Sequence, residues 1–263
     1  MNRSGRLRLL LHQYALSPIF VLFLVGIWEY LVRSLNVADY ILPPPSQILE
    51  RLITSRHMLI NHAVVTLQEA ILGFVLGAFS GMTCAAAMAR SRTVERMLYP
   101  LVISSQTFPK EALAPIFVVW FGFGILPKVI IAGLISFFPV VINTTRGLLS
   151  VDPLILDLMR SLSARPHQVF LKVQLPNAIP YLFAALKICV TLSVIGAVVG
   201  EFVGASAGLG HLIRLANSEL ATDLTFATLI VLGAMGTSLF LLVEGLEKGL
   251  MRRWRGTAPA LMR

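Results

Sequence analysis

The few side chains in this sequence that are able to do chemistry interrupt long apolar stretches. Lys110 and Glu111 lie near the middle of one stretch, Asn143 within a second, and Glu201 near the end of a third. Ionisable and amide groups are costly in such surroundings, and they often mark a path for a solute or an ion. These four residues are therefore our candidates for a translocation path.

Each candidate also has a structural alternative. Lys110 and Glu111 can neutralise each other, or extend toward a lipid head-group region. Asn143 can hydrogen-bond across to a neighbouring helix, since polar side chains hold helices together in lipid. Glu201 lies beside glycines, and its carboxylate can serve helix-end packing. Both interpretations stay open for all four residues.

The residue patterns of metal, redox and nucleotide sites are missing from the sequence. The five histidines show no metal-ligand spacing such as HxxxH. Cys84 and Cys189 both lie within apolar stretches, as small buried residues do. The glycine-rich segment 204–210 lacks the GxxxxGK[ST] pattern of a phosphate loop. We therefore expect no metal or redox cofactor and no ATP site in this chain. An enzyme embedded in the membrane would need clustered catalytic groups, and none appears.

The composition is that of an integral membrane protein. Of 263 residues, 56% are hydrophobic and only 13% are charged, whereas soluble domains carry about 25% charged residues. The mean hydropathy is +0.80. The apolar stretches reach the roughly 20 residues that a helix needs to cross about 30 Å of hydrocarbon. The net charge of +9 does not indicate nucleic-acid binding, because the cations cluster between apolar segments.

Six membrane-spanning helices are predicted, at residues 15–32, 63–89, 97–120, 129–149, 178–203 and 224–243. About fifteen of the 22 lysines and arginines then fall on one side, and the positive-inside rule makes that side cytoplasmic. Residues 1–14 form a cytoplasmic N-terminus, 15–250 a single transmembrane domain and 251–263 a cytoplasmic tail. The first apolar run lacks a small-residue cleavage site, so we expect a retained span and not a signal peptide.

Two segments outside the polar candidates have predictable structural roles. Gly73, Gly77 and Gly81 form a GxxxGxxxG row on one helix face, which predicts close helix packing. The extended segment 43–45 precedes Ser46, a predicted N-cap for an amphipathic helix that we place flat on the outer surface.

The predicted span 97–120 is irregular. Pro100, Pro109 and Pro115 interrupt it, and the charged pair Lys110–Glu111 lies inside it. Broken, charged backbone is tolerated at membrane depth only when it is buried in protein or lines a wet cavity. This span is therefore where we expect departure from a regular helix.

The most polar segment between the predicted spans is Asp157–Pro180. It lies between two apolar stretches and is predicted to form two short helices, Pro153–Ser163 and Pro166–Gln174. Proline is accepted in a first helical turn but not in an interior, so Pro166 predicts a start and Pro176 a stop. A cytoplasmic loop of this kind suits a soluble partner that moves the spans on either side. A passive channel gives no reason for such a loop.

This loop, within residues 150–180, resembles the EAA signature of the permeases of ABC importers, approximately EAA-x3-G-x9-I-x-LP. Asp157-Leu158-Met159 stands at the EAA triplet, Ser163 at the glycine and Val173-Gln174-Leu175-Pro176 at the end. The departures are Asp for Glu, which keeps the charge, Leu-Met for Ala-Ala, and Ser for Gly.

Three further blocks resemble the permeases of nitrate, sulfonate and taurine importers: ILPPPSQIL, ALAPIFVVWFGFG with FFPVVINT, and GEFVGASAGLGHLI. Importers of thiamine-precursor pyrimidines and of riboflavin share the pattern. The resemblance extends from about Ala15 to Trp254.

The resemblance implies an all-α permease of the type I importer kind, with six transmembrane helices and cytoplasmic coupling helices. The resemblance further implies that the permease works in a bacterial plasma membrane as a homodimer. Its partners would be two cytoplasmic ATPases that use ATP and an external solute-binding protein. The solute would be a small organic or anionic compound, selected mostly by the external protein. The alternative function is an ATP-independent channel or secondary transporter.

The resemblance also assigns the loop a role in docking to the ATPase. Asp157 and Arg160, three residues apart on one helical face, are predicted polar anchors, and Leu158, Leu162 and Phe170 are predicted apolar contacts toward the ATPase or the bundle. Arg160 can alternatively be only a positive-inside charge. The complete set of predicted coupling residues is Asp157, Leu158, Arg160, Leu162, Ser163, Ala164, Phe170 and Pro176.

Overall fold

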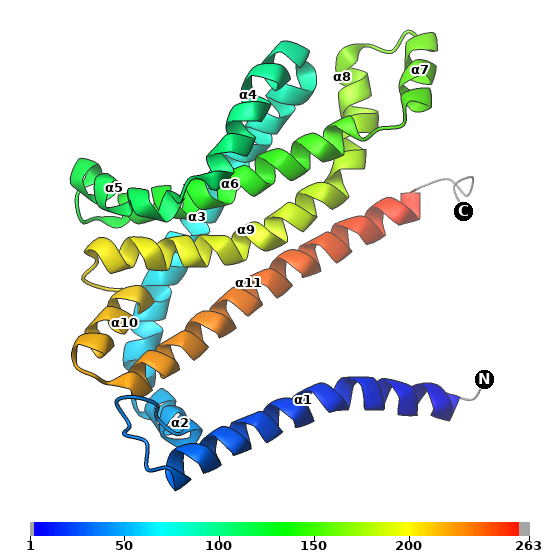
Figure 1. The fold of residues 1–263 in the computed structure, drawn as a ribbon. Coiled ribbons are helices and arrows are strands. Elements are labelled where there is room, and N and C mark those ends of the chain that lie inside the picture. The colour runs from blue at the N-terminus through cyan, green and yellow to red at the C-terminus, as the bar shows by residue number, and fades with distance from the viewer. Residues whose placement is uncertain (1–2, 258–263) are drawn as a thin grey trace. The chain divides into compact units, whose positions relative to one another are not determined.

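The structure is a computed structural model that describes the backbone of residues 3–257 and the side chains of residues 18–252. Every regular element within the described residues is helical (Figure 1). The α-helices are α1 (Arg3–Ser34), α2 (Pro45–Thr54), α3 (Arg56–Arg90), α4 (Arg92–Ser104), α5 (Ala114–Phe121), α6 (Ile125–Leu149), α7 (Pro153–Ser161), α8 (Pro166–Val169), α9 (Leu175–Gly204), α10 (Leu209–Ser218) and α11 (Thr222–Thr257). Short 3-10 turns cover Ser105–Thr107 and Lys110–Leu113, and Phe170–Gln174 is π-helical. The chain divides into two compact units, residues 1–60 with 212–230, and residues 61–211 with 231–263.

Four helical segments in the described part of the chain are long and apolar enough to cross a membrane. They are Arg56–Arg90, Ile125–Leu149, Pro166–Gly204 and Thr222–Arg252. Each contains one of the predicted spans, at 63–89, 129–149, 178–203 and 224–243. The first predicted span, 15–32, falls within α1, whose side chains are described only from residue 18. The structure therefore supports a multi-span helical protein with four spans defined by length and composition.

The segment predicted as a span at 97–120 is divided into pieces, as its prolines indicate. Pro100 lies inside α4 without ending it. The break falls instead at residues 105–113, where two 3-10 turns replace the α-helix. Pro109 precedes the second turn, and Pro115 occupies the first turn of α5, where its missing N–H costs nothing. The prediction of an irregular segment is confirmed.

In the first unit, the α2 helix begins two residues earlier than the N-cap prediction implies. Pro44 is the N-cap and Pro45 the first helical residue, so the assignment of Ser46 as N-cap was wrong. The carboxylate of Glu29, on α1, accepts both the backbone N–H of Ser46 at 3.0 Å and its hydroxyl at 2.8 Å. An acid from another helix thus satisfies a donor of the first turn, and it also suits the positive end of the helix.

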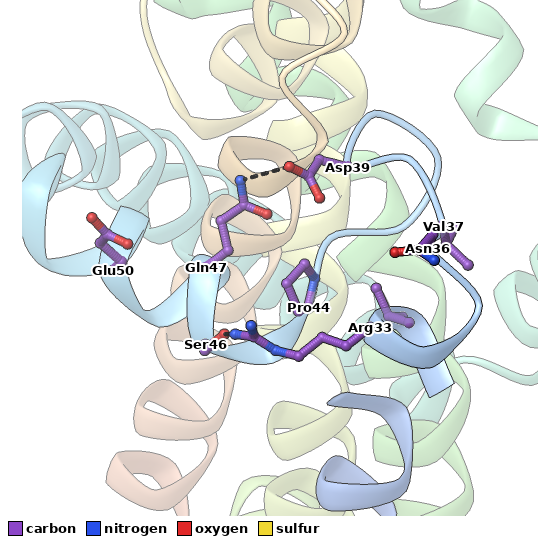
Figure 2. A pocket seen from close by; sticks show the side chains of 9 residues that line it. Arg33, Asn36, Val37, Asp39, Pro44, Ser46, Gln47 and Glu50 are labelled. Atoms are coloured by element: carbon purple, nitrogen blue, oxygen red, sulfur yellow. Dashed lines mark hydrogen bonds between the residues drawn. The ribbon is translucent and has the colours of Figure 1, made fainter. Parts of the chain in front are cut away.

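An open polar groove of about 630 Å³ lies beside this contact in the first unit (Figure 2). Its walls carry groups of both signs, including Arg33, Asp39 and Glu50. Several of these groups bond to one another: Gln47 donates to Asp39 at 3.4 Å, and Arg33 donates to the Ser46 hydroxyl at 3.0 Å. The groove is therefore part of the polar framework that joins α1 to α2.

In the second unit, α6 and α9 pack side by side along their length (Figure 1). Ser136 donates to the carbonyl of Cys189 at 3.2 Å, and the Cys189 thiol lies 3.1 Å from the carbonyl of Ser136. Gly147 on α6 meets Ala178 on α9, whereas Gly196 meets Ala132. Residue numbers rise along one helix as they fall along the other, so the two helices are antiparallel.

The predicted glycine row of α3 packs directly on α6. Gly73 lies against Ala132, Gly77 against the backbone of Gly133, and Gly81 against Val140. Numbers rise together in this pair, so α3 and α6 are parallel. The prediction of a helix-packing role for the row is confirmed, since small residues let two backbones approach closely.

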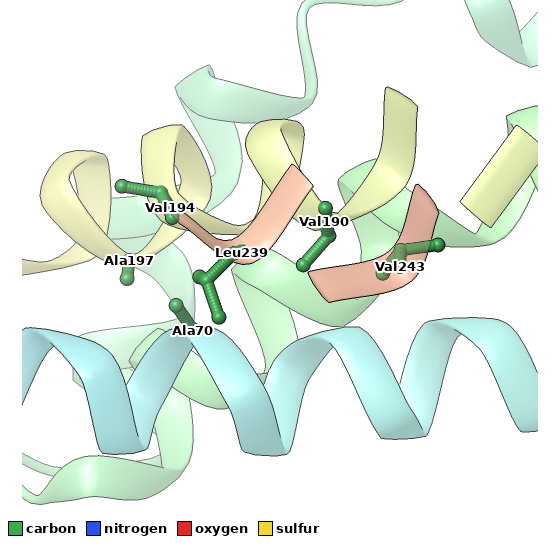
Figure 3. Packing of buried hydrophobic residues seen from close by; sticks show 6 residues of the cluster. All are labelled: Ala70, Val190, Val194, Ala197, Leu239 and Val243. Carbon is green, nitrogen blue, oxygen red and sulfur yellow. The ribbon is translucent and has the colours of Figure 1, made fainter. Parts of the chain in front are cut away.

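An apolar cluster joins α3, α9 and α11 in the second unit. Figure 3 shows its members side by side: Ala70, Val190, Val194, Ala197, Leu239 and Val243. All six are at most 9% exposed. Nearby, Lys187 on α9 and Glu247 on α11 form an ion pair at 2.7 Å with both side chains largely covered. These contacts fix α11, from residue 231 onward, to the rest of the unit.

The predicted helix stop at Pro176 is wrong. Helical structure continues from Pro166 through Gly204, and Pro176 lies in the first turn of α9. The five residues before α9, Phe170–Gln174, are π-helical. Pro176 has no N–H to donate, and its ring would crowd the carbonyl four residues earlier in a regular α-helix. The wider π-helical turns before it replace the α-helical hydrogen bonds at this place. The proline is thereby accommodated inside a continuous helix.

Candidate functional site

The α7 helix presents an apolar stripe that nothing in the described chain covers. Leu154, Leu158 and Leu162 recur at four-residue spacing, which places them on one side of a helix. Their exposed fractions are 75%, 59% and 67%. Asp152 caps the helix by accepting the N–H of Leu154 at 2.9 Å, so the stripe is held on a defined helix. The predicted contacts Leu158 and Leu162 thus face away from the bundle.

The two predicted polar anchors of α7 bond to each other. Arg160 donates to Asp157 at 2.8 Å, and both side chains are well exposed, at 79% and 64%. Exposed pairs of this kind contribute little to stability, about 0–1 kcal/mol. Both charges therefore remain accessible to a partner.

Ser163, at the position of the signature glycine, adopts a left-handed backbone conformation with φ of 53°. The Ser163 N–H donates to the carbonyl of Arg160 at 2.9 Å, and the Ala164 N–H donates to the carbonyl of Met159 at 3.0 Å. This bonding pattern is a Schellman motif, which usually places glycine at the left-handed residue. Serine thus occupies a glycine conformation, and the sharp turn after α7 is retained.

Replacing Ser163 with glycine is expected to stabilise this turn. Glycine adopts positive φ without the steric cost of a side chain, and we expect a gain of about 0.5–1 kcal/mol in local stability. Hydrogen exchange at the Ala164 amide should slow roughly two- to fivefold. Ser163→Val should accelerate that exchange, because β-branched residues are strained at positive φ. Equal exchange in all three proteins would contradict the role assigned to this turn.

Phe170, a predicted coupling residue, and Asn177, which was not predicted, connect the loop to the bundle. Phe170 packs against a buried cluster formed by Ala85, Leu148 and Ala178. Asn177 donates to the carbonyl of Gly147 at 2.9 Å, which ties the start of α9 to the end of α6. The segment after α7 is therefore joined by contacts to both α6 and α9.

The path candidates Lys110, Glu111 and Asn143 have different surroundings. The ammonium of Lys110 lies 4.5 Å from the ring centre of Phe138 on α6, and no ion pair joins it to Glu111 within the described residues. Glu111 is exposed. Asn143 donates to the carbonyl of Pro139 in its own helix at 2.8 Å, and its role in the path stays a prediction.

Glu201 is completely buried, and its carboxylate holds the segment that follows α9. Its Oε1 accepts the hydroxyl of Thr66 at 2.7 Å, and its Oε2 accepts the backbone N–H of Gly210. Gly208 has φ of 109°, and a Cβ there would collide with the carboxylate. The structure therefore favours the helix-end packing alternative for Glu201.

Two further buried ionisable residues, Lys128 and Glu69, were not predicted from the sequence. Lys128 on α6 donates to Glu69 on α3 at 2.9 Å, with side-chain exposures of 7% and 1%. His62, Thr66 and Glu69 recur at i, i+4 and i+7 along α3, which puts them on one face. His62 accepts the Gly208 N–H at 3.0 Å, and Thr66 accepts the Leu209 N–H at 2.8 Å. A polar stripe at helical spacing within an apolar stretch was the signal available to find them.

Comparison with known proteins identifies relatives along most of the chain. A family model described as "Binding-protein-dependent transport system inner membrane component" matches residues 73–256. The formylaminopyrimidine transport permease protein ThiX of Halalkalibacterium halodurans is 37% identical over 243 residues, covering 92% of this chain and 96% of the relative. The putative aliphatic sulfonates transport permease protein SsuC of Bacillus subtilis is 32% identical over 237 residues, covering 89% and 85%. Among solved structures, an inward-facing form of the MetNI methionine ABC transporter matches with a TM-score of 0.65 at 18% identity, covering 74% of this chain and 97% of that chain.

Proposed function

Since the chain belongs to the family of binding-protein-dependent transport system inner membrane components and is a permease of the ABC importer class, we propose that it carries a small organic solute into the cell. It is a multi-pass protein of the plasma membrane and is not itself an enzyme. The named relatives transport a formylaminopyrimidine and aliphatic sulfonates. A solute of that size, either a sulfonate- or taurine-like anion or a vitamin precursor, is the class we assign.

The proposal includes six spans with both termini in the cytoplasm. Helix directions support it: α3 and α6 are parallel to each other, and α6 is antiparallel to α9, as spans two, four and five require. The ends of α3 and α6 that approach Glu201 would face outward, and the α7–α8 loop would face the cytoplasm. The basic residues between spans agree with this orientation.

The observation that carries the coupling role is the exposed apolar stripe of α7. Three leucines on a polar, cytoplasmic loop need a protein partner to cover them, because exposed apolar patches commonly mark interaction sites. We assign that partner as a cytoplasmic ATPase, with α7 and α8 as coupling helices. A second permease copy and an external solute-binding protein would complete the importer, and ATP would be bound only by the ATPase. Lys110, Glu111 and Asn143 remain the candidates for the translocation path.

Reconstituted uptake is the direct test of this function. Vesicles containing the permease, its ATPase and the external binding protein should accumulate solute only with ATP inside the compartment that holds the ATPase. Omitting the ATPase should reduce uptake to background. Equal uptake without ATP would instead support a channel or a secondary transporter.

A further inference from the structure

A groove of about 650 Å³ lies in the second unit, where α3 ends, α4 begins and α6 ends. Ala89 from α3 and Leu149 from α6 line it. The α4 helix supplies the other lining residues, which are Arg92, Glu95, Arg96, Tyr99 and Pro100. Ser91 caps α4 by accepting the N–H of Val94 at 3.4 Å, so these side chains project from a defined helix. The groove thus presents two guanidinium groups beside an aromatic ring and apolar walls.

The guanidinium groups of Arg92 and Arg96 have no partner within the described residues. Neither forms an ion pair or a hydrogen bond there, and Glu95 pairs with neither. By contrast, Arg160 and Lys187 each bond to a carboxylate, at 2.8 Å and 2.7 Å. Two arginines and one glutamate give the lining a net charge of +1. An unpaired guanidinium keeps its N–H donors available, and their planar arrangement matches the oxygens of a phosphate group.

The face of α4 that bears the arginines becomes apolar farther along the helix. Arg92, Arg96, Tyr99 and Ile103 recur at i, i+4, i+7 and i+11, which places them on one side of the helix. The Tyr99 ring packs against a buried apolar cluster that α4 forms with α3 and α6, and Ile103 is 43% exposed. At 1.5 Å per residue, Ile103 lies about 10 Å beyond Arg96, inside the predicted span 97–120. Cations at the membrane surface and apolar groups below them complement a phospholipid.

We propose that this groove binds an anionic phospholipid, with Arg92 and Arg96 donating to its phosphate oxygens and its acyl chains lying along α4. The ends of α3 and α6 that line the groove face the cytoplasm in the proposed orientation, and basic pockets between helices on that side suit anionic head groups. The choice of leaflet rests on that orientation, whereas the groove and its unpaired charges do not. A bound lipid would hold the turn between α3 and α4 at the membrane surface.

Native mass spectrometry of the purified permease measures the binding. The probe is phosphatidylglycerol, and phosphatidylcholine with the same acyl chains, which has no net charge, should bind less tightly. Arg92→Gln and Arg96→Gln should each weaken binding of phosphatidylglycerol about fivefold, the usual contribution of one arginine at an anionic surface, and the double variant about twenty-fivefold. Glu95→Gln should strengthen binding, because the phosphate group loses a repelling neighbour.

Arg56→Gln is the matched control for these variants. Arg56 is also exposed and has no side-chain partner among the described residues, but it does not line the groove. Its replacement should leave the affinity for phosphatidylglycerol unchanged. All of these substitutions alter side chains that are exposed or half-buried, so each melting temperature should stay within about 2 °C of wild type. A change in affinity then reports the site and not the fold.

Glycerol phosphate and inorganic phosphate separate a lipid from a soluble ligand. Both carry a phosphate group without acyl chains, so they should displace phosphatidylglycerol only at a large excess. Three results would overturn the proposal: wild-type affinity in the double arginine variant, equal binding of phosphatidylcholine, or displacement of the lipid by equimolar glycerol phosphate, which would indicate a site for a soluble phosphate compound. None of these measurements requires transport or a known orientation, so their failure is distinguishable from failure of the proposed function.

Discussion

Replacing Leu158 with glutamate is expected to abolish solute uptake while leaving the permease folded. Leu158 lies at the centre of the α7 stripe and is 59% exposed, so the new charge meets no neighbour in this chain. In a complex with the ATPase, the same carboxylate would be buried against an apolar surface. An unpaired buried charge costs several kcal/mol, and about 3–4 kcal/mol corresponds to a loss of more than a hundredfold in affinity. Co-purification of the ATPase with the permease measures the effect.

Leu35→Glu is the matched control for this experiment. Leu35 is similarly exposed, at 70%, but follows α1 in the first unit and is predicted to lie on the outer side. It should retain the ATPase and the uptake rate. Arg160→Ala should have a small effect, because its ion pair with Asp157 is exposed. Full association of the Leu158→Glu permease with the ATPase would contradict the docking role of α7.

The coarse architecture was predictable because hydropathy and proline placement act locally. Apolar length located four spans that the structure contains. The glycine row of α3 predicted close packing, and its spacing alone carried that information. The prolines at 109 and 115 predicted the broken segment, although Pro100 did not interrupt α4. The rule that proline ends a helix failed at Pro176, because the π-helical residues before it accommodate the proline within a continuous helix.

The buried polar site was only half predictable. Glu201 stood out as an acid near the end of an apolar segment, but its partner Thr66 lies more than 130 positions earlier in the chain. Lys128 was not among the predicted residues, because a single sequence does not reveal which helix faces it. Ser46 was assigned as an N-cap for the same reason: the acceptor that replaced it, Glu29, belongs to another helix. Contacts between distant segments were the missing information.

Replacing Gly77 with valine is expected to disrupt the packing of α3 against α6 and to destabilise the permease. A Cβ at residue 77 would lie 2.5 Å from the carbonyl oxygen of Gly133 and 2.8 Å from the Cβ of Ser136. The obstructing atoms belong largely to backbone, which does not move aside as a flexible side chain does. Overpacking of this kind costs about 3 kcal/mol or more. The melting temperature of the purified permease should therefore fall by about 6–12 °C.

Gly233→Ala is the control, because nothing lies within 4 Å of a Cβ at that position in α11. Alanine is the better helix former by about 1 kcal/mol, so this variant should melt at the wild-type temperature or slightly above it. The contrast distinguishes a steric requirement at one interface from a general effect of adding side-chain atoms to a membrane helix. Equal melting of the Gly77→Val permease and the wild type would mean that α3 and α6 are not held at this distance. The parallel arrangement that supports the six-span orientation would then lose its basis.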